Sequence, residues 1–346
     1  MNRSIFIFLL FCLLIGTLIV IFSSHWFPIW MGLELSTLSI LPLLSTNFIS
    51  RNNEAILKYF LVQAFSAALL LNGAILNLWL TNSWNINFTE GLLPHSIISL
   101  ALIIKLGLAP CHFWFPDVLS GITFLEGLLI ACWQKIAPFF LIISLNSSII
   151  NEILLVSSII SVIIGGWGGL NQTSIRKILA YSSISHIGWI LAASFFSQNA
   201  GLALFILYLL FNTLIFLLCH SINIKSISFL NIVSLSPTNI ILFLTSILSL
   251  GGLPPLGGFL NKLIPLIIFI NNSNIILTIP FLIGSLLSLF FYLRLTFNSS
   301  LILFPQHSIN LINWRSHNFN NTLFTSILFS FTVFGLLLFP IIFSLI

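Results

Sequence analysis

Residues 96–116 read SIISLALIIKLGLAPCHFWFP, and this stretch indicates how the whole chain folds. An α-helix needs about 20 apolar residues to cross a bilayer core about 30 Å thick, and this stretch is long enough to do so. Two features separate it from an ordinary membrane helix: Lys105 lies inside it, and Pro110 follows five residues later. Because proline cannot donate to the carbonyl of Leu106, we expect the helix to break beside the lysine.

The composition of the whole chain is that of a membrane protein. Of its 346 residues, 58% are hydrophobic and only 5% are charged, and the mean hydropathy is +1.16. Soluble domains carry about 25% charged residues, so this chain lacks the charge to cover a water-exposed surface. The apolar runs are continuous and do not alternate as the strands of an outer-membrane barrel would. We therefore predict an all-α integral membrane protein.

Eleven segments are long and apolar enough to be membrane spans. They are residues 5–22, 26–44, 54–80, 96–115, 124–145, 153–170, 175–195, 202–219, 240–270, 275–296 and 322–346. With this count, one face of the membrane receives the eight basic residues Arg3, Arg51, Lys58, Arg176, Lys177, Lys225, Arg294 and Arg315, and the other receives none. The positive-inside rule therefore places the N-terminus and the basic loops on the matrix or cytoplasmic side.

Three lysines remain inside the predicted spans: Lys105, Lys135 and Lys262. A lysine at the centre of a membrane helix costs about 2.5–3.5 kcal/mol, and such residues commonly mark ion or proton paths. Glu34 and His186 also lie within spans, and histidine is well suited to carry protons near neutral pH. Two other interpretations stay open, namely lysines that extend to the membrane surface and static buried ion pairs.

A second interrupted span matches the first. Residues 249–262 read SLGGLPPLGGFLNK and share a Leu-Gly-x-x-Pro core with residues 106–110. We expect helix breaks at Pro110 and at Gly251, Gly252, Pro254 and Pro255. Paired breaks are typical of inverted repeats around a midplane site. The predicted organisation is one membrane domain, 1–346, with helices 1–5 in residues 1–145, helices 6–10 in residues 150–297, and an eleventh helix in residues 322–346.

Several kinds of site have no support in the sequence. The four cysteines form no CxxC pair, which argues against a zinc or iron–sulfur site. Neither a GxGxxG nor a GxxxxGK[ST] motif is present, which argues against dinucleotide and phosphate binding. A net charge of +5 is too sparse for a nucleic-acid surface. We expect no metal, no bound cofactor and no nucleic-acid partner.

The motifs resemble those of the antiporter-like membrane subunits of respiratory complex I, which are related to Mrp-type cation/proton antiporters. The resemblance covers nearly the whole chain and rests on WMGLE at 30–34, KYFL at 58–61, KLGLAPCHFW at 105–114, WQKIAP at 133–138 and YSSISH at 181–186. It implies that Glu34 and Lys105 form a coupling pair, that Lys135 and His186 are relays, and that Lys262 faces the exit. His112 and Lys58 are secondary candidates.

The resemblance also implies a function and partners. The chain would translocate protons across the mitochondrial inner membrane, with its C-terminus in the intermembrane space, as part of an NADH:ubiquinone oxidoreductase. NADH, FMN, iron–sulfur clusters and ubiquinone would belong to other subunits. Its neighbours would be the lipid bilayer, an antiporter-like subunit of the chain 4 type and small hydrophobic subunits. The alternatives are a stand-alone cation/proton antiporter and a structural scaffold without its own proton path.

Overall fold

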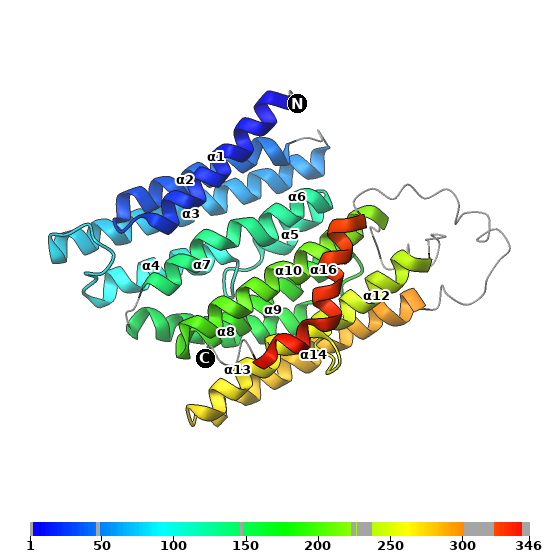
Figure 1. Cartoon of the computed structure of the whole chain (residues 1–346). Helices are drawn as coiled ribbons and strands as arrows, with labels where there is room; N and C mark the ends of the chain where they lie inside the picture. Colours follow the sequence, from blue (N-terminus) through cyan, green and yellow to red (C-terminus); the bar gives the residue numbers. More distant parts are fainter. Residues whose placement is uncertain are drawn as a thin grey trace. The chain divides into compact units, whose positions relative to one another are not determined.

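The computed structural model describes residues 3–45, 49–145, 148–222, 226, 237–300 and 322–340. The described residues are mainly helical, which confirms the predicted all-α class (Figure 1). Eight of the described helices are long and apolar enough to cross a membrane. Contacts within the chain divide it into two compact units, Met1–Ile160 and Ser161–Ile346. The predicted repeat boundaries stay a prediction.

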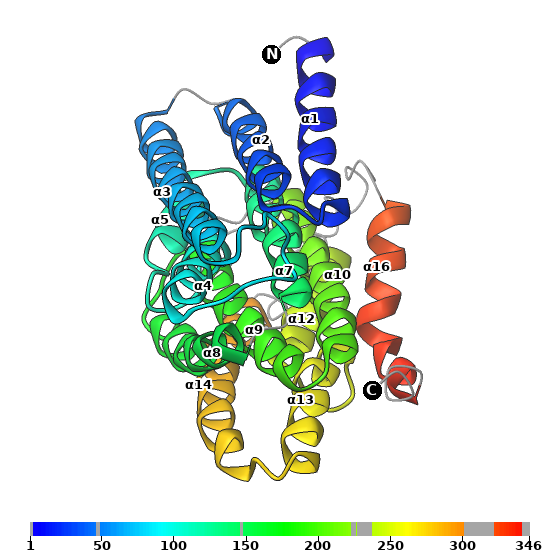
Figure 2. The same cartoon turned by 90° about the vertical axis from the view of Figure 1, so that its left-hand side faces the viewer.

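The first unit begins with three long helices. Its elements are α1 (Arg3–Phe22), α2 (Trp26–Leu44), α3 (Ser50–Thr81), α4 (Leu92–Leu106), α5 (Trp114–Gly121), α6 (Phe124–Leu128), the π-helix η1 (Leu129–Trp133) and α7 (Gln134–Ser144), and α8 (Ser148–Gly168) continues into the second unit. Helices α1, α2 and α3 are neighbours in sequence and in space (Figure 2). A methyl group on Gly16 or on Gly32 would lie 2.8 Å from the carbonyl oxygen of the other, so α1 and α2 cross in direct backbone contact.

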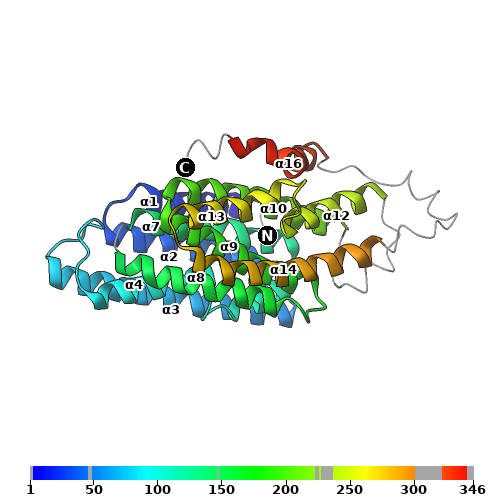
Figure 3. The ribbon, with the colours of Figure 1, turned by 90° about the horizontal axis from the view of Figure 1, so that it is seen from below.

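The second unit is built around one deeply buried helix. Its elements after α8 are α9 (Ile175–Phe196), α10 (Gln198–Ile222), α12 (Pro237–Gly251), the 3₁₀-helix η2 (Gly257–Phe259), α13 (Leu260–Asn271), α14 (Ile275–Ser300), α16 (Thr322–Phe334) and the 3₁₀-helix η4 (Gly335–Leu338). Helix α9 contacts α10, α13 and α14 (Figure 3). Of its span, 83% is buried, the largest share among the eight candidate spans, so α9 is the core of this unit.

The two interrupted spans end their first helix in the same way. Helix α4 ends at Leu106 and α12 ends at Gly251, and in each case a glycine in the left-handed region follows, Gly107 with φ 72° and Gly252 with φ 74°. The glycine N–H bonds the carbonyl three residues back, and the next N–H bonds the carbonyl five residues before itself. This is a Schellman-type helix end, and it occurs here inside an apolar segment.

The first break begins before the proline that predicted it. Helix α4 ends beside Lys105, at Leu106, and Gly107 closes it by adopting a backbone conformation that other residues rarely reach. Pro110 lies in the non-helical segment between α4 and α5. In the shared Leu-Gly-x-x-Pro sequence, Gly107 aligns with Gly251. In the structure, the residue that closes the helix as Gly107 does is Gly252. Pro254 and Pro255 lie in the non-helical segment after Gly252, as expected.

Contacts between loops agree with the predicted alternation of membrane faces. Backbone hydrogen bonds of 3.0 Å join residues 24–26 to residues 84–86, which places the first and third loops together. An ion pair between Lys58 and Asp117 (3.5 Å) joins the start of α3 to the fourth loop. At the end of α14, Arg294 donates to the carbonyls of Leu170 and Gln172 in the loop after α8. Each of these three contacts joins residues of the same unit and of the same predicted membrane face.

Every predicted span overlaps a described helix or a pair of helices, but the count of eleven spans stays a prediction. Two predicted spans are divided by the breaks, and the helices on either side of each break are short. Lys225, Arg315 and residues 341–346 of the last predicted span lie outside the described residues.

Candidate functional site

Lys105 lies at the buried end of a broken helix. It occupies the last turn of α4 and is only 5% exposed. Its Nζ is buried and has no hydrogen-bond partner in the described part of the chain. The carbonyls at a helix C-terminus carry partial negative charge, so the end of α4 favours a cation at this position. The break therefore gives Lys105 a favourable electrostatic environment without a carboxylate in direct contact.

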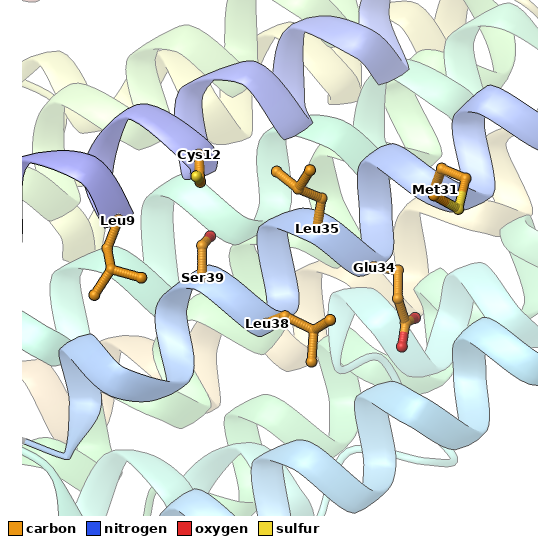
Figure 4. Close-up of a pocket in the computed structure, with 7 residues that line it drawn as sticks. All are labelled: Leu9, Cys12, Met31, Glu34, Leu35, Leu38 and Ser39. Atoms are coloured by element: carbon orange, nitrogen blue, oxygen red, sulfur yellow. The ribbon is translucent and has the colours of Figure 1, made fainter. Parts of the chain in front are cut away.

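Glu34 is the carboxylate that acts electrostatically on Lys105. It belongs to α2 and lines a largely apolar groove of about 350 Å³, which is formed by residues of α1 and α2. Figure 4 shows its side chain extending from α2 on the side away from Cys12. Its Oε2 is buried and has no hydrogen-bond partner among the described residues. Glu34 and Lys105 thus attract each other without a direct ion pair.

Lys135 follows an irregular turn in the middle of a span. Residues Leu129–Trp133 form a π-helix, in which the N–H of Gln134 bonds the carbonyl of Leu129 five residues earlier. Lys135 is only 2% exposed, and its Nζ lies 4.4 Å from the centroid of the Phe115 ring. The face of an aromatic ring attracts a cation, so Phe115 of α5 stabilises the Lys135 ammonium. Short π-helical turns often accompany functional positions.

Lys262 reaches back to the second helix break. It lies near the start of α13, and its Nζ donates a 2.7 Å hydrogen bond to the carbonyl oxygen of Gly251, the last residue of α12. The side chain passes over Gly252, where a Cβ would lie 2.9 Å from the Lys262 Cδ. Glycine at this position therefore permits both the left-handed turn and the close approach of the lysine. Lys262 is partly buried, so it is not simply exposed at a surface.

His186 occupies the middle of α9 and is 4% exposed. Its Nε2 lies 3.3 Å from the hydroxyl of Tyr292 on α14, and its ring lies 6.3 Å from the Tyr208 ring. Ser182, one turn before His186 on α9, is a second polar side chain near the Tyr292 hydroxyl. The histidine thus belongs to a hydrogen-bonded group that joins α9 to α14.

The secondary candidates have different surroundings. His112 is 3% exposed, lies in the segment between α4 and α5, and has its Nδ1 3.2 Å from the carbonyl oxygen of Pro110. Lys58 is partly exposed and pairs with Glu54 at 2.7 Å and with Asp117 at 3.5 Å. His112 therefore belongs to the first helix break, whereas Lys58 belongs to an exposed ion-pair group.

The arrangement contains residues that the sequence did not single out. Phe115, Gly107 and Tyr292 contact the candidate residues or shape their surroundings. Tyr292 carried a weak signal, because only four tyrosines occur in the chain and this one lies within an apolar span. The aromatic contact of Phe115 carried no signal, because the chain has 35 phenylalanines.

Two family models match the chain over successive ranges. Residues 23–288 match the model described as NADH:quinone oxidoreductase/Mrp antiporter, transmembrane, and residues 289–343 match NADH dehydrogenase subunit 2 C-terminus. The NADH-ubiquinone oxidoreductase chain 2 of Paracentrotus lividus is 49% identical over 99% of this chain and 98% of its own length. The corresponding protein of Sylvisorex granti is 39% identical over the full length of both chains.

Solved structures show the same fold. A chain of respiratory complex I from Thermus thermophilus, solved with bound aureothin, matches with a TM-score of 0.81 and 27% identity over 98% of this chain and 80% of that chain. A chain of the Mrp complex from Dietzia sp. matches at 20% identity with a TM-score of 0.75, over 83% of this chain and 59% of that chain, and this likeness concerns the fold alone. Together with the family models and the relatives, these matches establish that the chain belongs to the NADH-ubiquinone oxidoreductase chain 2 family of complex I membrane subunits.

Proposed function

We propose that this subunit translocates protons through Glu34, Lys105, Lys135, His186 and Lys262, driven by quinone reduction in other subunits. The observation that carries the proposal is that three lysines lie in apolar spans beside irregular backbone. Lys105 lies at a helix end, Lys135 over an aromatic ring after a π-helix, and Lys262 against a backbone carbonyl. An isolated buried ammonium is expensive unless its environment stabilises it. A helix end, an aromatic ring and a backbone carbonyl do so here.

The mechanism begins with the Glu34–Lys105 pair. Burial favours the neutral form of a lysine, and a nearby carboxylate favours the charged form. Movement of Glu34 toward or away from Lys105 would therefore change how tightly Lys105 holds its proton. Repulsion between like charges would then pass this change to Lys135 and onward to Lys262, with His186 as a relay.

The energy needed to move a proton against the membrane potential sets how far the pKa of a lysine has to change. Moving one elementary charge against the membrane potential costs about 2.3 kcal/mol per 100 mV. One pKa unit corresponds to about 1.36 kcal/mol, so a change of roughly two units between the states of a lysine supplies this energy at 100 mV. The mechanism therefore requires only a modest electrostatic change at each lysine.

The test is the substitution Lys135→Met in the assembled complex, reconstituted into liposomes. Methionine keeps an unbranched side chain and removes the charge, so we expect NADH oxidation to translocate fewer protons per electron. Lys177→Met is the matched control, because Lys177 lies partly exposed in the first turn of α9. An unchanged proton-to-electron ratio for Lys135→Met would instead support the scaffold role.

A stand-alone antiporter is the weaker candidate. The match of residues 289–343 to a model of the NADH dehydrogenase subunit 2 C-terminus favours a complex I subunit. Purification of the chain by itself with sodium- or potassium-dependent proton exchange would reverse this preference. Its isolation only as part of a large complex agrees with the proposal.

The remaining parts of the proposal concern location and partners. The basic residues favour a matrix-facing N-terminus and an intermembrane-space C-terminus in the mitochondrial inner membrane. The neighbours in the membrane would include an antiporter-like subunit of the chain 4 type and small hydrophobic subunits. NADH, FMN, iron–sulfur clusters and ubiquinone would be bound by other subunits, because this sequence carries no motif for them.

A further inference from the structure

Tyr292 links the buried histidine of α9 to the second helix break. Tyr292 is only 2% exposed, and its hydroxyl lies 3.3 Å from the Nε2 of His186. Ser182, one turn before His186 on α9, is a second polar neighbour of this hydroxyl, and its own hydroxyl donates to the carbonyl of Leu179 at 2.8 Å. A tyrosine hydroxyl can donate and accept at the same time, so it can exchange a proton on one side while holding a second partner.

The ring of Tyr292 packs against the helix break that binds Lys262. A Cβ on Gly251 would lie 3.6 Å from both the Cβ and the Cδ2 of Tyr292, which is ordinary van der Waals contact. The carbonyl of that same glycine accepts the hydrogen bond from the Lys262 ammonium. Tyr292 therefore contacts His186 through its hydroxyl. At the other end of the side chain, its Cβ and ring edge contact Gly251, whose carbonyl binds Lys262.

We propose that Tyr292 is the hydroxyl relay between His186 and the lysine at the α12–α13 break. A protonated His186 gives its Nε2 proton to the Tyr292 oxygen, while the hydroxyl releases its own proton to water, which delivers it to a neutral Lys262. The tyrosine is neutral before and after the step, the histidine becomes neutral, and the lysine becomes charged. This inference rests on the proposed function and adds to it a residue outside the lysine, glutamate and histidine set.

The test compares two identical substitutions at equally buried sites. Tyr292→Phe removes the hydroxyl and keeps the ring. Tyr59→Phe is the matched control, because Tyr59 is 1% exposed and its hydroxyl has no hydrogen-bond partner in the described part of the chain. We expect Tyr292→Phe to slow proton translocation roughly five- to tenfold, the effect of one ordinary hydrogen bond, and to lower the protons translocated per electron. Tyr59→Phe should change neither.

A double variant separates a relay from a packing role. If the two groups act in one route, His186→Gln combined with Tyr292→Phe should translocate no fewer protons per electron than His186→Gln alone, whereas independent packing defects would add. The ratio refers to each electron, so it does not depend on how much complex assembles. Additive losses, or a Tyr292→Phe ratio equal to that of Tyr59→Phe, would overturn the relay.

The design also distinguishes the relay from the function on which it rests. If Lys135→Met lowers the proton-to-electron ratio but Tyr292→Phe does not, the relay is wrong and the proposed function stands. If neither Lys135→Met nor His186→Gln lowers the ratio, the proposed function is wrong and the relay falls with it.

Discussion

The three lysines found in the predicted spans each lie against a group that carries no full charge. Lys105 lies at a helix C-terminus, Lys135 lies over the Phe115 ring, and Lys262 donates to a backbone carbonyl. A close ion pair in a dry site holds both partners in their charged forms, because separating them leaves an isolated buried charge. Dipoles and aromatic rings attract a cation more weakly, so they permit a lysine to lose its proton.

The first residue-level prediction concerns Glu34→Gln. Glutamine keeps the size and the hydrogen-bonding capacity of the side chain but removes the charge that acts on Lys105. We expect the complex to assemble normally and to translocate fewer protons per electron, measured in liposomes with a pH-sensitive dye. Glu90→Gln serves as the control, because Glu90 is exposed in a loop. An equal effect of both variants would show that Glu34 has no special role.

At the scale of elements, the two helix breaks depend on backbone contacts that only glycine allows. The carbonyl of Ser249 accepts the 2.9 Å hydrogen bond from Gly252 that closes the end of α12. A Cβ on Gly258 of η2 would overlap this same carbonyl oxygen. The packing of η2 against the end of α12 therefore leaves no room for a side chain at Gly258.

Gly258→Ala should consequently destabilise the second unit. Overpacking of this kind costs about 1–3 kcal/mol, because the backbone has to move. We expect less assembled complex on native gels and a lower thermal midpoint of unfolding. Leu253→Ala, in the segment between α12 and η2, controls for a change at the break, since Leu253 is partly exposed and its truncation adds no atoms. Equal stability of the two variants would contradict the steric argument.

The helices themselves were largely predictable from the sequence, whereas their internal irregularities were only partly so. Apolar length alone located α2 at residues 26–44 and α9 to within one residue. The break in the fourth span was predicted from Pro110, because proline has a strong local signal, whereas the closing role of Gly107 was not predicted. The π-helix before Lys135 carried no recognised signal, since its five residues are ordinary helix formers and packing decides their hydrogen bonds.

The candidate residues were predictable for a different reason. A charge in an apolar span is visible in the sequence because its burial is costly, which is how Glu34, Lys105, Lys135 and Lys262 were found. The contacts of Lys135 and Lys262 with the Phe115 ring and the Gly251 carbonyl involve neutral groups. Neutral groups of this kind occur throughout the chain, so only the three-dimensional structure identifies those that matter.

At the scale of the whole molecule, the length of α3 determines which loops face opposite sides of the membrane. Its 32 residues extend about 48 Å at 1.5 Å per residue, more than a bilayer core about 30 Å thick. Residues just inside its first turn and in the loop after it therefore lie on opposite sides. Combined with the distribution of basic residues, this predicts that the start of α3 lies on the matrix side.

Cysteine labelling tests this orientation. Asn53 and Asn87 are both exposed, one near the start of α3 and one in the loop after it. A membrane-impermeant thiol reagent should label Asn53→Cys only in inside-out submitochondrial particles and Asn87→Cys only in mitoplasts. The unsubstituted chain gives the background, because Cys12 and Cys111 are partly exposed. The reverse pattern would invert the proposed topology.

The π-helix at Leu129–Trp133 also affects the direction in which α7 presents its side chains. One residue corresponds to about 100° of rotation around an α-helix axis. If these five residues rewound into ordinary α-helical turns while the segment before them stayed in place, Lys135 would swing around that axis and leave the Phe115 ring. The direction in which the Lys135 ammonium points therefore depends on how the neutral residues Leu129–Trp133 are wound.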